Sequence, residues 1–495
     1  MKEKQMVRIK ILVLAIIMVG CLILMIGCRK KAEATSIRIS TDSRVELMSL
    51  IFRLAKNPEY NQGRIKSYND DADKHFASFE EQDVVKMARK LRESRGVSYD
   101  AVMKMAVHVT DAFSLNERIP FDPQPETLDK RWTPENAREF LKVARRFVKK
   151  SDFEGFIKAH TDLYDLAATR MQAVMEEHGV LDWFNDFFGD RPGARFELIL
   201  GMLNGPASYG ARIKLSEKDE ILYCVLGVWD TDDQGQPEFS ERVLPTVVHE
   251  FCHSYCNPLV DKHAADLEAS AKPIFALVEE TMRGMAYASW QTMMRESLVR
   301  ASVIRYMLAK QGEEAARKHI ETEKERKFFW MDGLVDLLNE YEQNRETYPR
   351  MDDFFPEIVA FFEDYVQRID DDVKAYQEEQ RKKMEELKAK SPKIVSMIPV
   401  NGSQDVDPDL KAIVVTFDRP MNKTSYAVMR FSDKFPEKAG KAGFDESGKV
   451  FTIPVKLEPD REYELGLNAE NFFAFQSEKK EILYPVVIRF KTRKK

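Results

Sequence analysis

The sequence predicts an α+β protein, in which a large, mainly helical domain with a small β-sheet precedes an all-β sandwich. Apolar residues recur at helical spacing from about residue 45 to 369, apart from a short β-prone stretch at roughly 196–230. From residue 391 onward, short strand-like runs separated by turn residues replace the long helical segments. The length of 495 residues also favours more than one domain.

The composition excludes several classes of protein. Hydrophobic residues make up 44% of the chain and aromatic residues 11%, which is enough for a packed core and too much for a disordered chain. Charged residues make up 32%, but the net charge is only −6. No strong field of one sign is therefore predicted, and nucleic acid is not expected as a partner.

Residues 1–28 are predicted to be a lipoprotein signal peptide. Lysine and arginine residues precede an uninterrupted apolar run at residues 11–26, which is followed by a glycine and then Cys28. Cleavage before Cys28 would make this cysteine the lipidation site. An uncleaved membrane anchor is the alternative. Both readings place the rest of the chain outside the cytoplasm, in the cell envelope and attached to a bacterial membrane, with residues 29–40 as a tether.

Two folded domains are expected, at residues 41–390 and 391–495. In the first, the turn residues 204–206 and the apolar segment 221–229 indicate two or three strands just before a histidine-bearing helix. A highly charged helical segment at 371–390 is expected to close the first domain.

The strongest chemical signal lies in the segment 247–253. His249 and His253 are four residues apart, so their imidazoles project from one face of a helix and can bind the same metal ion. Glu250 lies about 100° around the helix, beside the metal, where a general base would deprotonate a zinc-bound water. The helix is expected to end at Asn257-Pro258. Its predicted buried stripe comprises Leu244, Val248, Phe251 and Tyr255.

A catalytic Zn²⁺ site needs a third protein ligand and one open position. Glu296 is the favoured candidate, because it lies on an apolar helical face and Arg300, one turn later, could orient its carboxylate. Glu280 and Glu279 are alternatives. An ordinary surface pair between Glu296 and Arg300 is the non-functional interpretation.

The cysteines after the signal segment are Cys224, Cys252 and Cys256, an odd and sparse set that does not indicate a disulfide framework. Cys256 lies seven residues after His249, on the same side of the helix. One helix rarely supplies three ligands to a tetrahedral ion, so a buried apolar role is predicted for this thiol. Packing is expected to stabilise the fold.

Three residues are candidates to stabilise an oxyanion formed on a substrate carbonyl: Tyr209, Tyr287 and Arg300. None of them is favoured over the others. The segment 209–213 is predicted to be an edge strand along which an extended peptide could align.

Residues 40–370 resemble a family of uncharacterised bacterial lipoproteins that are predicted zinc peptidases of the gluzincin type. The resemblance is carried by Val247–His253, Asn257-Pro258, Trp290 and 296–301, with weaker matches at 44–47 and 98–103. It implies a zincin-like catalytic domain. It also implies that His249, His253 and Glu296 are metal ligands and that Glu250 is the base.

The C-terminal segment resembles a bacterial Ig-like domain. The matching residues are 398–402, 405–408, 414–421 and 457–463. Such a resemblance implies a spacer or adhesion module on an exported protein and no catalytic role.

The sequence thus predicts a zinc-dependent peptidase that acts outside the cytoplasm on peptide or protein substrates and is held to the membrane by an N-terminal lipid. A binding or scaffold lipoprotein with a relict zinc site is the alternative. A zinc hydrolase acting on a non-peptide amide, such as one in cell-wall material, is a third hypothesis.

Overall fold

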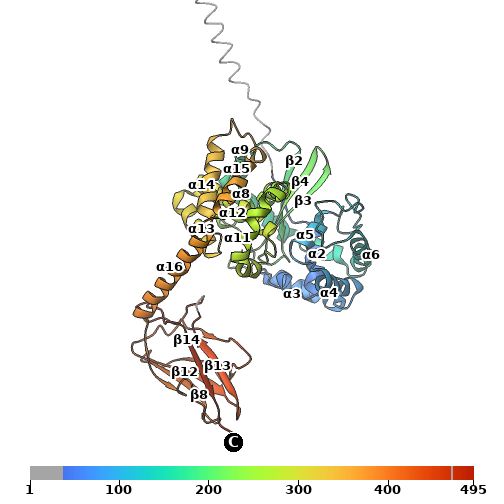
Figure 1. Ribbon diagram of the computed structural model, residues 1–495. Coiled ribbons are helices and arrows are strands. Elements are labelled where there is room, and N and C mark those ends of the chain that lie inside the picture. Colours follow the sequence, from blue (N-terminus) through green and yellow to red (C-terminus); the bar gives the residue numbers. More distant parts are fainter. Residues whose placement is uncertain (1–36, 470–471, 495) are drawn as a thin grey trace, which may run out of the picture. The chain divides into compact units, whose positions relative to one another are not determined.

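The structure is a computed structural model, and it describes residues 37–469 and 472–494. The predicted signal peptide with Cys28 and the first part of the predicted tether lie outside these residues. The chain divides into two compact units at residues 369 and 370 (Figure 1). Within the described ranges, no helix is long and apolar enough to cross a membrane.

A four-stranded sheet forms the centre of the first unit, with the strand order β1-β2-β4-β3. β1 pairs in parallel with β2, and β2 pairs in parallel with β4. β3 lies at the edge of the sheet and pairs antiparallel with β4. The strands are β1 (Ile37–Ser40), β2 (Ala194–Gly201), β3 (Tyr209–Ser216) and β4 (Asp219–Gly227). β4 is buried along most of its length, as expected for a strand covered on both faces. The strands predicted between residues 196 and 230 are therefore confirmed.

Residues 37–40 form a strand, so the prediction of a tether over 29–40 was wrong for these four residues. β1 pairs with β2 in parallel, with Ile37 opposite Phe196 and Ile39 opposite Leu198. The two strands are more than 150 residues apart in the chain. The sequence of residues 37–40 alone does not reveal a strand, because the backbone hydrogen bonds of this segment are made with a strand that is distant in the chain.

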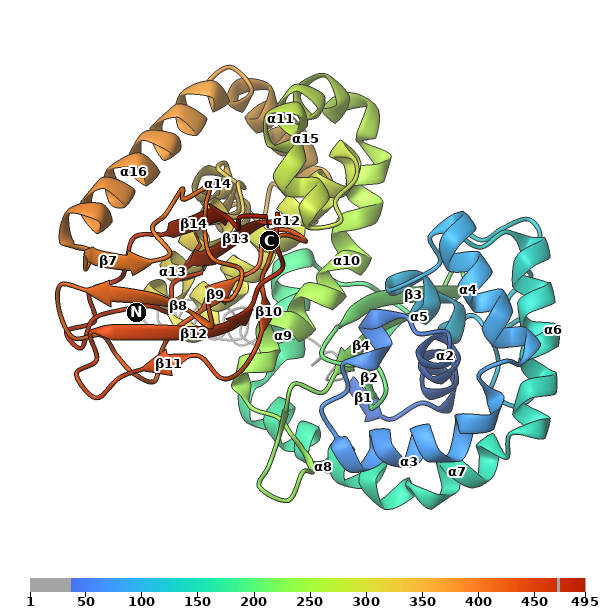
Figure 2. The same ribbon diagram turned by 90° about the horizontal axis from the view of Figure 1, so that it is seen from below.

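Helices cover both faces of the sheet. α2 (Ser43–Leu54) and α5 (Asp100–Val107) pack on one face, and α10 (Leu244–Lys262) packs on the other, against β3 and β4 (Figure 2). A short hairpin, β5 (Asp230–Thr231) and β6 (Pro237–Glu238), precedes α10. The helices between β1 and β2 are α2 (Ser43–Leu54), α3 (Lys66–Phe76), α4 (Asp83–Arg95), α5 (Asp100–Val107), α6 (Pro134–Lys150), α7 (Phe153–Ala159), α8 (Thr161–His178) and α9 (Val180–Phe188). Those after α10 are α11 (Ala264–Gly284), α12 (Trp290–Gln311), α13 (Glu313–Glu325), α14 (Met331–Gln343) and α15 (Met351–Tyr365).

α10 continues through Pro258 to Lys262, so the prediction that Asn257-Pro258 ends the helix was wrong. Proline has no N–H, which leaves the carbonyl of Ser254 without its intrahelical partner. Arg191 Nη1 donates a hydrogen bond to this carbonyl at 2.9 Å. A side chain outside the helix thus replaces the missing hydrogen bond, and α10 extends by a further turn.

The second unit contains two antiparallel sheets that enclose one apolar core, so the predicted all-β C-terminal region is confirmed. The first sheet has the order β10-β12-β8-β7, with β11 also pairing with β12, and the second has the order β14-β13-β9. The strands are β7 (Ile394–Ile398), β8 (Ala412–Phe417), β9 (Val428–Met429), β10 (Glu437–Lys438), β11 (Gly443–Phe444), β12 (Val450–Lys456), β13 (Glu462–Leu467) and β14 (Val486–Lys491).

The helix α16 (Ile369–Lys390) lies at the division between the two units. It was expected to close the domain 41–390, but the division at residue 369 groups nearly all of it with the second unit. Ile369 is its only buried residue. A helix that is charged on all sides has no apolar face with which to join a core, so its sequence pattern could not assign it to either unit.

Candidate metal centre

The helix α10 holds both histidines at fixed positions. Its predicted stripe of Leu244, Val248, Phe251 and Tyr255 is buried, which confirms that interpretation and fixes the rotation of the helix about its axis. His249 and His253 consequently face away from this stripe, toward α12. Both side chains remain about one-fifth exposed.

The helix α12 presents Glu296 to these histidines. Ser289 begins the helix by accepting a hydrogen bond from the N–H of Thr292, at 3.3 Å. Nearly every residue from 293 to 307 is buried, because α12 packs among α10, α11, α13 and α14. The small residues Ser297 and Ala301 are fully buried and allow close helix packing. Glu296 is therefore held at a fixed position in the core and is only 7% exposed.

The three side chains form a group that could hold one metal ion. Glu296 Oε2 lies 3.7 Å from His249 Nε2, and Glu296 Oε1 lies 3.6 Å from His253 Nε2. All candidate ligand atoms lie within 4.8 Å of one another. A tetrahedral Zn²⁺ with bonds of about 2.0–2.2 Å would separate its ligand atoms by roughly 3.3–3.6 Å. Glu296 Oε2 is buried and accepts no hydrogen bond, and the nearest cationic group to it is the guanidinium of Arg300, with Nη2 3.2 Å away.

Of the three glutamates considered as the third ligand, the structure brings only Glu296 into this group. Glu279 forms an ion pair with Arg283 at 2.7 Å, and Glu280 is exposed. Both lie on α11. Only the packing of α12 against α10 distinguishes between them.

Asn257 orients one of the histidines, a role that the sequence analysis missed. Its Oδ1 lies 3.3 Å from His253 Nδ1. An amide oxygen can only accept, so this contact places the proton on Nδ1 and leaves the lone pair of Nε2 directed at Glu296. Asn257 lies one helical turn after His253, and this spacing is the feature of the sequence from which its contact with the imidazole could have been predicted. Burial lowers the pKa of His249, with smaller contributions from His253 and Arg300, and this favours the neutral ligand form.

Glu250 lies beside the group and against the edge strand β3. It is 8% exposed. Burial raises the pKa of its carboxyl to about 7, while His253 and a hydrogen bond from the Gly210 backbone oppose the shift. A Cβ at Gly210 would lie 2.4 Å from the carbonyl oxygen of Glu250, so only glycine allows β3 and α10 to approach this closely. The carboxylate therefore lies between the edge strand and the histidines.

Arg300 connects Glu296 with residues deeper in the protein. Its Nη2 lies 3.2 Å from Glu296 Oε2 and donates to the Tyr287 hydroxyl at 2.6 Å. Its Nη1 bonds both carboxylate oxygens of Glu323, at 2.9 and 2.8 Å. Glu323 is fully buried and also accepts from Arg326 at 2.9 Å. The predicted orienting role of Arg300 thus has a structural basis, but Glu323, on α13, gave no signal in the sequence.

The other sequence candidates lie in different environments. Tyr287 lines the cavity beside Arg300, and burial raises its pKa to about 12, so the phenol keeps its proton. The hydroxyl of Tyr209 is buried without a partner. Cys252 and Cys256 are buried, as expected, and burial raises their pKa values well above the usual range. Neither thiol belongs to the group of candidate ligands.

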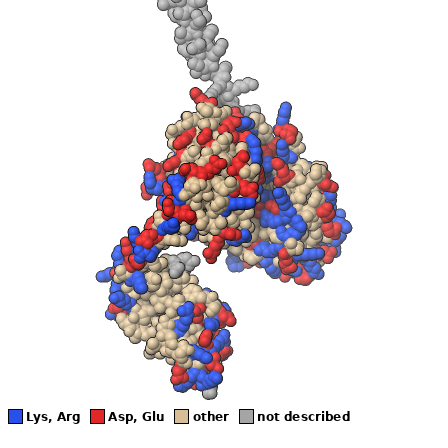
Figure 3. Space-filling view, in the orientation of Figure 1, with Lys and Arg blue, Asp and Glu red and all other residues tan. Residues whose placement is uncertain are grey.

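A cavity of about 720 Å³ reaches these residues. One wall comes from α10 and α12 and includes His249, Glu250, His253 and Glu296. Residues 208–212, at the start of β3, border the cavity, and the opposite wall comes from Tyr99, Asp100, Lys104 and residues 126–131. Acidic and basic side chains are interspersed over the visible face of the first unit (Figure 3), in agreement with the low net charge.

No curated protein matches the chain. Solved structures give only weak similarity. CopC from Methylosinus trichosporium OB3b is 13% identical over 21% of this chain and 93% of that chain, with a TM-score of 0.16. Domains 1–6 of the surface layer protein SbsC are 12% identical over 54% of this chain and 35% of that chain, with a TM-score of 0.15. The S-layer protein rSbsC(31-844) is 12% identical over 83% of this chain and 46% of that chain, also with a TM-score of 0.15. TM-scores this low do not show a shared fold.

Family models account for both units. Residues 388–492 match the bacterial Ig-like domain, which agrees with the two-sheet structure of the second unit. Residues 37–361 match the model described as "Domain of unknown function (DUF4932)". This match covers most of the chain and contains every residue of the candidate metal centre. The chain therefore belongs to the DUF4932 family and carries a C-terminal bacterial Ig-like domain.

Proposed function

We propose that the first unit is a zincin-like, zinc-dependent peptidase. One observation carries the proposal: two histidines and a glutamate form a metal-sized group on the wall of a large cavity, with a second buried glutamate beside them. Two imidazoles and one carboxylate, with room for a water, form a ligand set typical of catalytic zinc. The cavity also favours an enzyme over a scaffold protein with a relict site, since a relict site has no need of a groove.

The residues around the centre have distinct roles in this proposal. Bound Zn²⁺ would act as a Lewis acid toward a carbonyl and would lower the pKa of water. Glu250 accepts the proton of the attacking water and passes it to the leaving amine. Tyr287 donates a hydrogen bond to the oxyanion, because its protonated hydroxyl lines the cavity next to Arg300. β3, an edge strand, offers backbone groups with which an extended peptide can pair.

Metal analysis tests the proposal first. Purified residues 32–495 should contain about one zinc per chain, and His249→Ala should lose it, because two of three ligands hold the ion poorly. Elemental analysis measures both, and circular dichroism confirms that the variant is folded. A well-folded wild-type protein without zinc would contradict the proposal. A panel of peptides and non-peptide amides would then identify the class of substrate.

We further propose that the protein is exported and carries a lipid on Cys28. The predicted signal sequence and the bacterial Ig-like domain support this proposal. Labelled palmitate should be incorporated into the wild-type protein in bacterial cells, and Cys28→Ser should abolish the label. Equal labelling of the two proteins would contradict lipidation at this residue.

A further inference from the structure

Tyr99 has an unusual backbone conformation on the cavity wall opposite the metal centre. Its φ is 51° and its ψ is −127°, a region that non-glycine residues rarely adopt. It directly precedes α5, and the residue is 46% exposed. It lines the same cavity as His249, His253 and Glu296. The backbone is therefore strained at an exposed aromatic residue that faces a candidate active site.

Hydrogen bonds hold the peptide groups on both sides of Tyr99. The carbonyl of Tyr99 accepts from the hydroxyl of Tyr60 at 3.1 Å and from the N–H of Val102 at 3.1 Å. The preceding carbonyl, of Ser98, accepts from Arg131 Nη1 at 3.3 Å. The strained conformation thus depends on three different segments of the chain.

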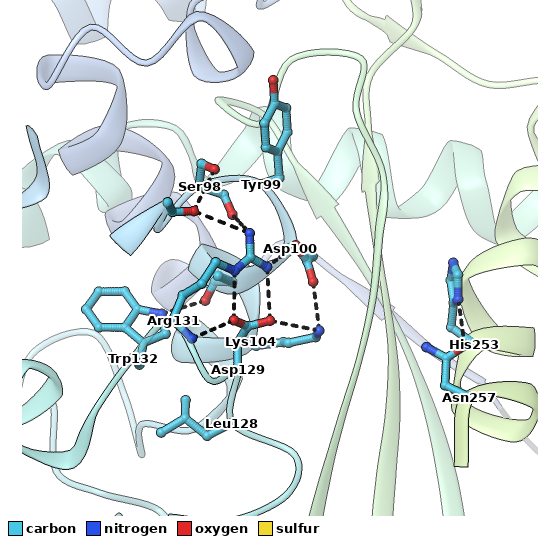
Figure 4. A network of polar contacts seen from close by, with 12 residues as sticks. Ser98, Tyr99, Asp100, Lys104, Leu128, Asp129, Arg131, Trp132, His253 and Asn257 are labelled. Atoms are coloured by element: carbon cyan, nitrogen blue, oxygen red, sulfur yellow. Dashed lines mark hydrogen bonds and ion pairs between the residues drawn. The ribbon is translucent and has the colours of Figure 1, made fainter. Parts of the chain in front are cut away.

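A cluster of buried and half-buried charges fixes Arg131 in turn. Its guanidinium bonds both carboxylate oxygens of Asp129, at 2.7 and 2.9 Å, and also contacts Asp100. Lys104 Nζ lies 2.7 Å from Asp100 and 3.3 Å from Asp129. In Figure 4 these four side chains converge below the backbone of Tyr99, while the tyrosine ring points away from them. The cluster satisfies its own charges and supports the segment that carries the ring.

The ring itself does little for the packing of the protein. Among the described residues it stacks on no other aromatic ring, and its only ring contact is the guanidinium of Arg92, 6.0 Å from the ring centre. Leu128, which lines the same wall, is 1% exposed, and the other side chains there are mainly charged. Tyr99 is therefore the exposed large hydrophobic residue among those that line this wall. A strained residue that gains so little packing is more typical of a binding site than of a core.

The position of Tyr99 relative to β3 indicates what it would bind. α5 packs against β3, and the cavity runs along this edge strand. In an extended peptide paired with β3, successive side chains point in opposite directions. Alternate side chains would then point toward α10 and its histidines and toward the start of α5. A tyrosine ring at that point favours a flat, apolar partner, because aromatic rings gain from stacked or edge-to-face contacts.

We propose that Tyr99 is a specificity-determining residue that binds an aromatic side chain of the peptide substrate. The inference rests on the proposed peptidase function. The charge cluster of Asp100, Lys104, Asp129 and Arg131 positions the segment 98–99 and makes no contact with the reacting atoms.

The decisive substitution is Tyr99→Gly, because glycine loses the ring but accepts the positive φ. We expect the thermal unfolding midpoint and the zinc content to stay equal to wild type or to increase. The value of kcat/KM for peptides with a phenylalanine or tyrosine should fall 10- to 100-fold, to that of otherwise identical peptides with alanine. Tyr99→Phe should keep the preference. Leu277→Ala is a matched control, since Leu277 is also 46% exposed but does not line the cavity.

A binding measurement separates this inference from the proposed catalysis. In a Glu250→Gln background, fluorescence anisotropy with labelled peptides reports selection without turnover. Loss of aromatic preference on adding Tyr99→Gly supports the inference, even where no peptide is hydrolysed. The inference is overturned if the preference survives that substitution, if the parent protein shows no such preference, or if Tyr99→Gly lowers the unfolding midpoint, which would indicate a structural role for the ring.

Discussion

Replacing Glu250 by glutamine is expected to leave about one zinc per chain and to lower kcat by about 10²- to 10⁴-fold, the usual contribution of a general base. Glutamine has nearly the same volume and can still accept the hydrogen bond from Gly210, so the close contact of β3 with α10 should persist. Its amide cannot accept the proton of the attacking water. Elemental analysis and initial rates on a peptide library measure the two effects.

The matched control for this substitution is Glu126→Gln. Glu126 lines the same cavity on the opposite wall, where it pairs with Arg212 at 2.9 Å, and its side chain is 72% exposed. Loss of this charge should change kcat little. Turnover by Glu250→Gln equal to that of the wild type would refute the mechanism, even with zinc present.

Replacing Arg300 by methionine is expected to lower both the stability and the zinc affinity. The substitution leaves Glu323, which is fully buried, without the guanidinium that bonds both of its oxygens. Removing one partner of a buried ion pair costs about 3–5 kcal/mol of unfolding free energy. Glu296 loses its orienting contact as well, and such losses typically weaken metal binding by about 10- to 100-fold.

A second arginine on α12 separates these two effects. Arg305 forms an ion pair with Glu342 and donates to Asn339 at 2.8 Å, but it does not line the cavity. Arg305→Met should destabilise the protein and leave the zinc affinity unchanged. Urea unfolding gives the stabilities, and competition with a chelator gives the affinities. Equal zinc affinity in Arg300→Met and Arg305→Met would show that Arg300 has only a structural role.

Local periodicity was sufficient to predict several parts of this protein. The stripe that includes Val248 and Phe251 predicted which face of α10 is buried, because helical spacing depends only on neighbours in the chain. The same spacing placed His249 and His253 side by side. For a similar reason, short apolar runs predicted two or three strands between residues 196 and 230 and the sandwich after residue 391.

Features that depend on distant segments required the tertiary structure. Ile37–Ser40 is a strand because its partner lies in β2, and α10 passes through Pro258 because Arg191 bonds the free carbonyl. The packing of α12 on α10 selected Glu296 over the glutamates of α11.

By itself the sequence determined the pair of histidines, the glutamate beside them and the succession of a helical and an all-β unit. Each of these follows from contacts within a few residues. Only the tertiary structure decided which carboxylate completes the candidate metal group, which buried charges hold it, and that Tyr99 faces it across a cavity. These features join segments up to about 200 residues apart. No local pattern encodes such contacts, because they arise from the packing of whole helices and strands.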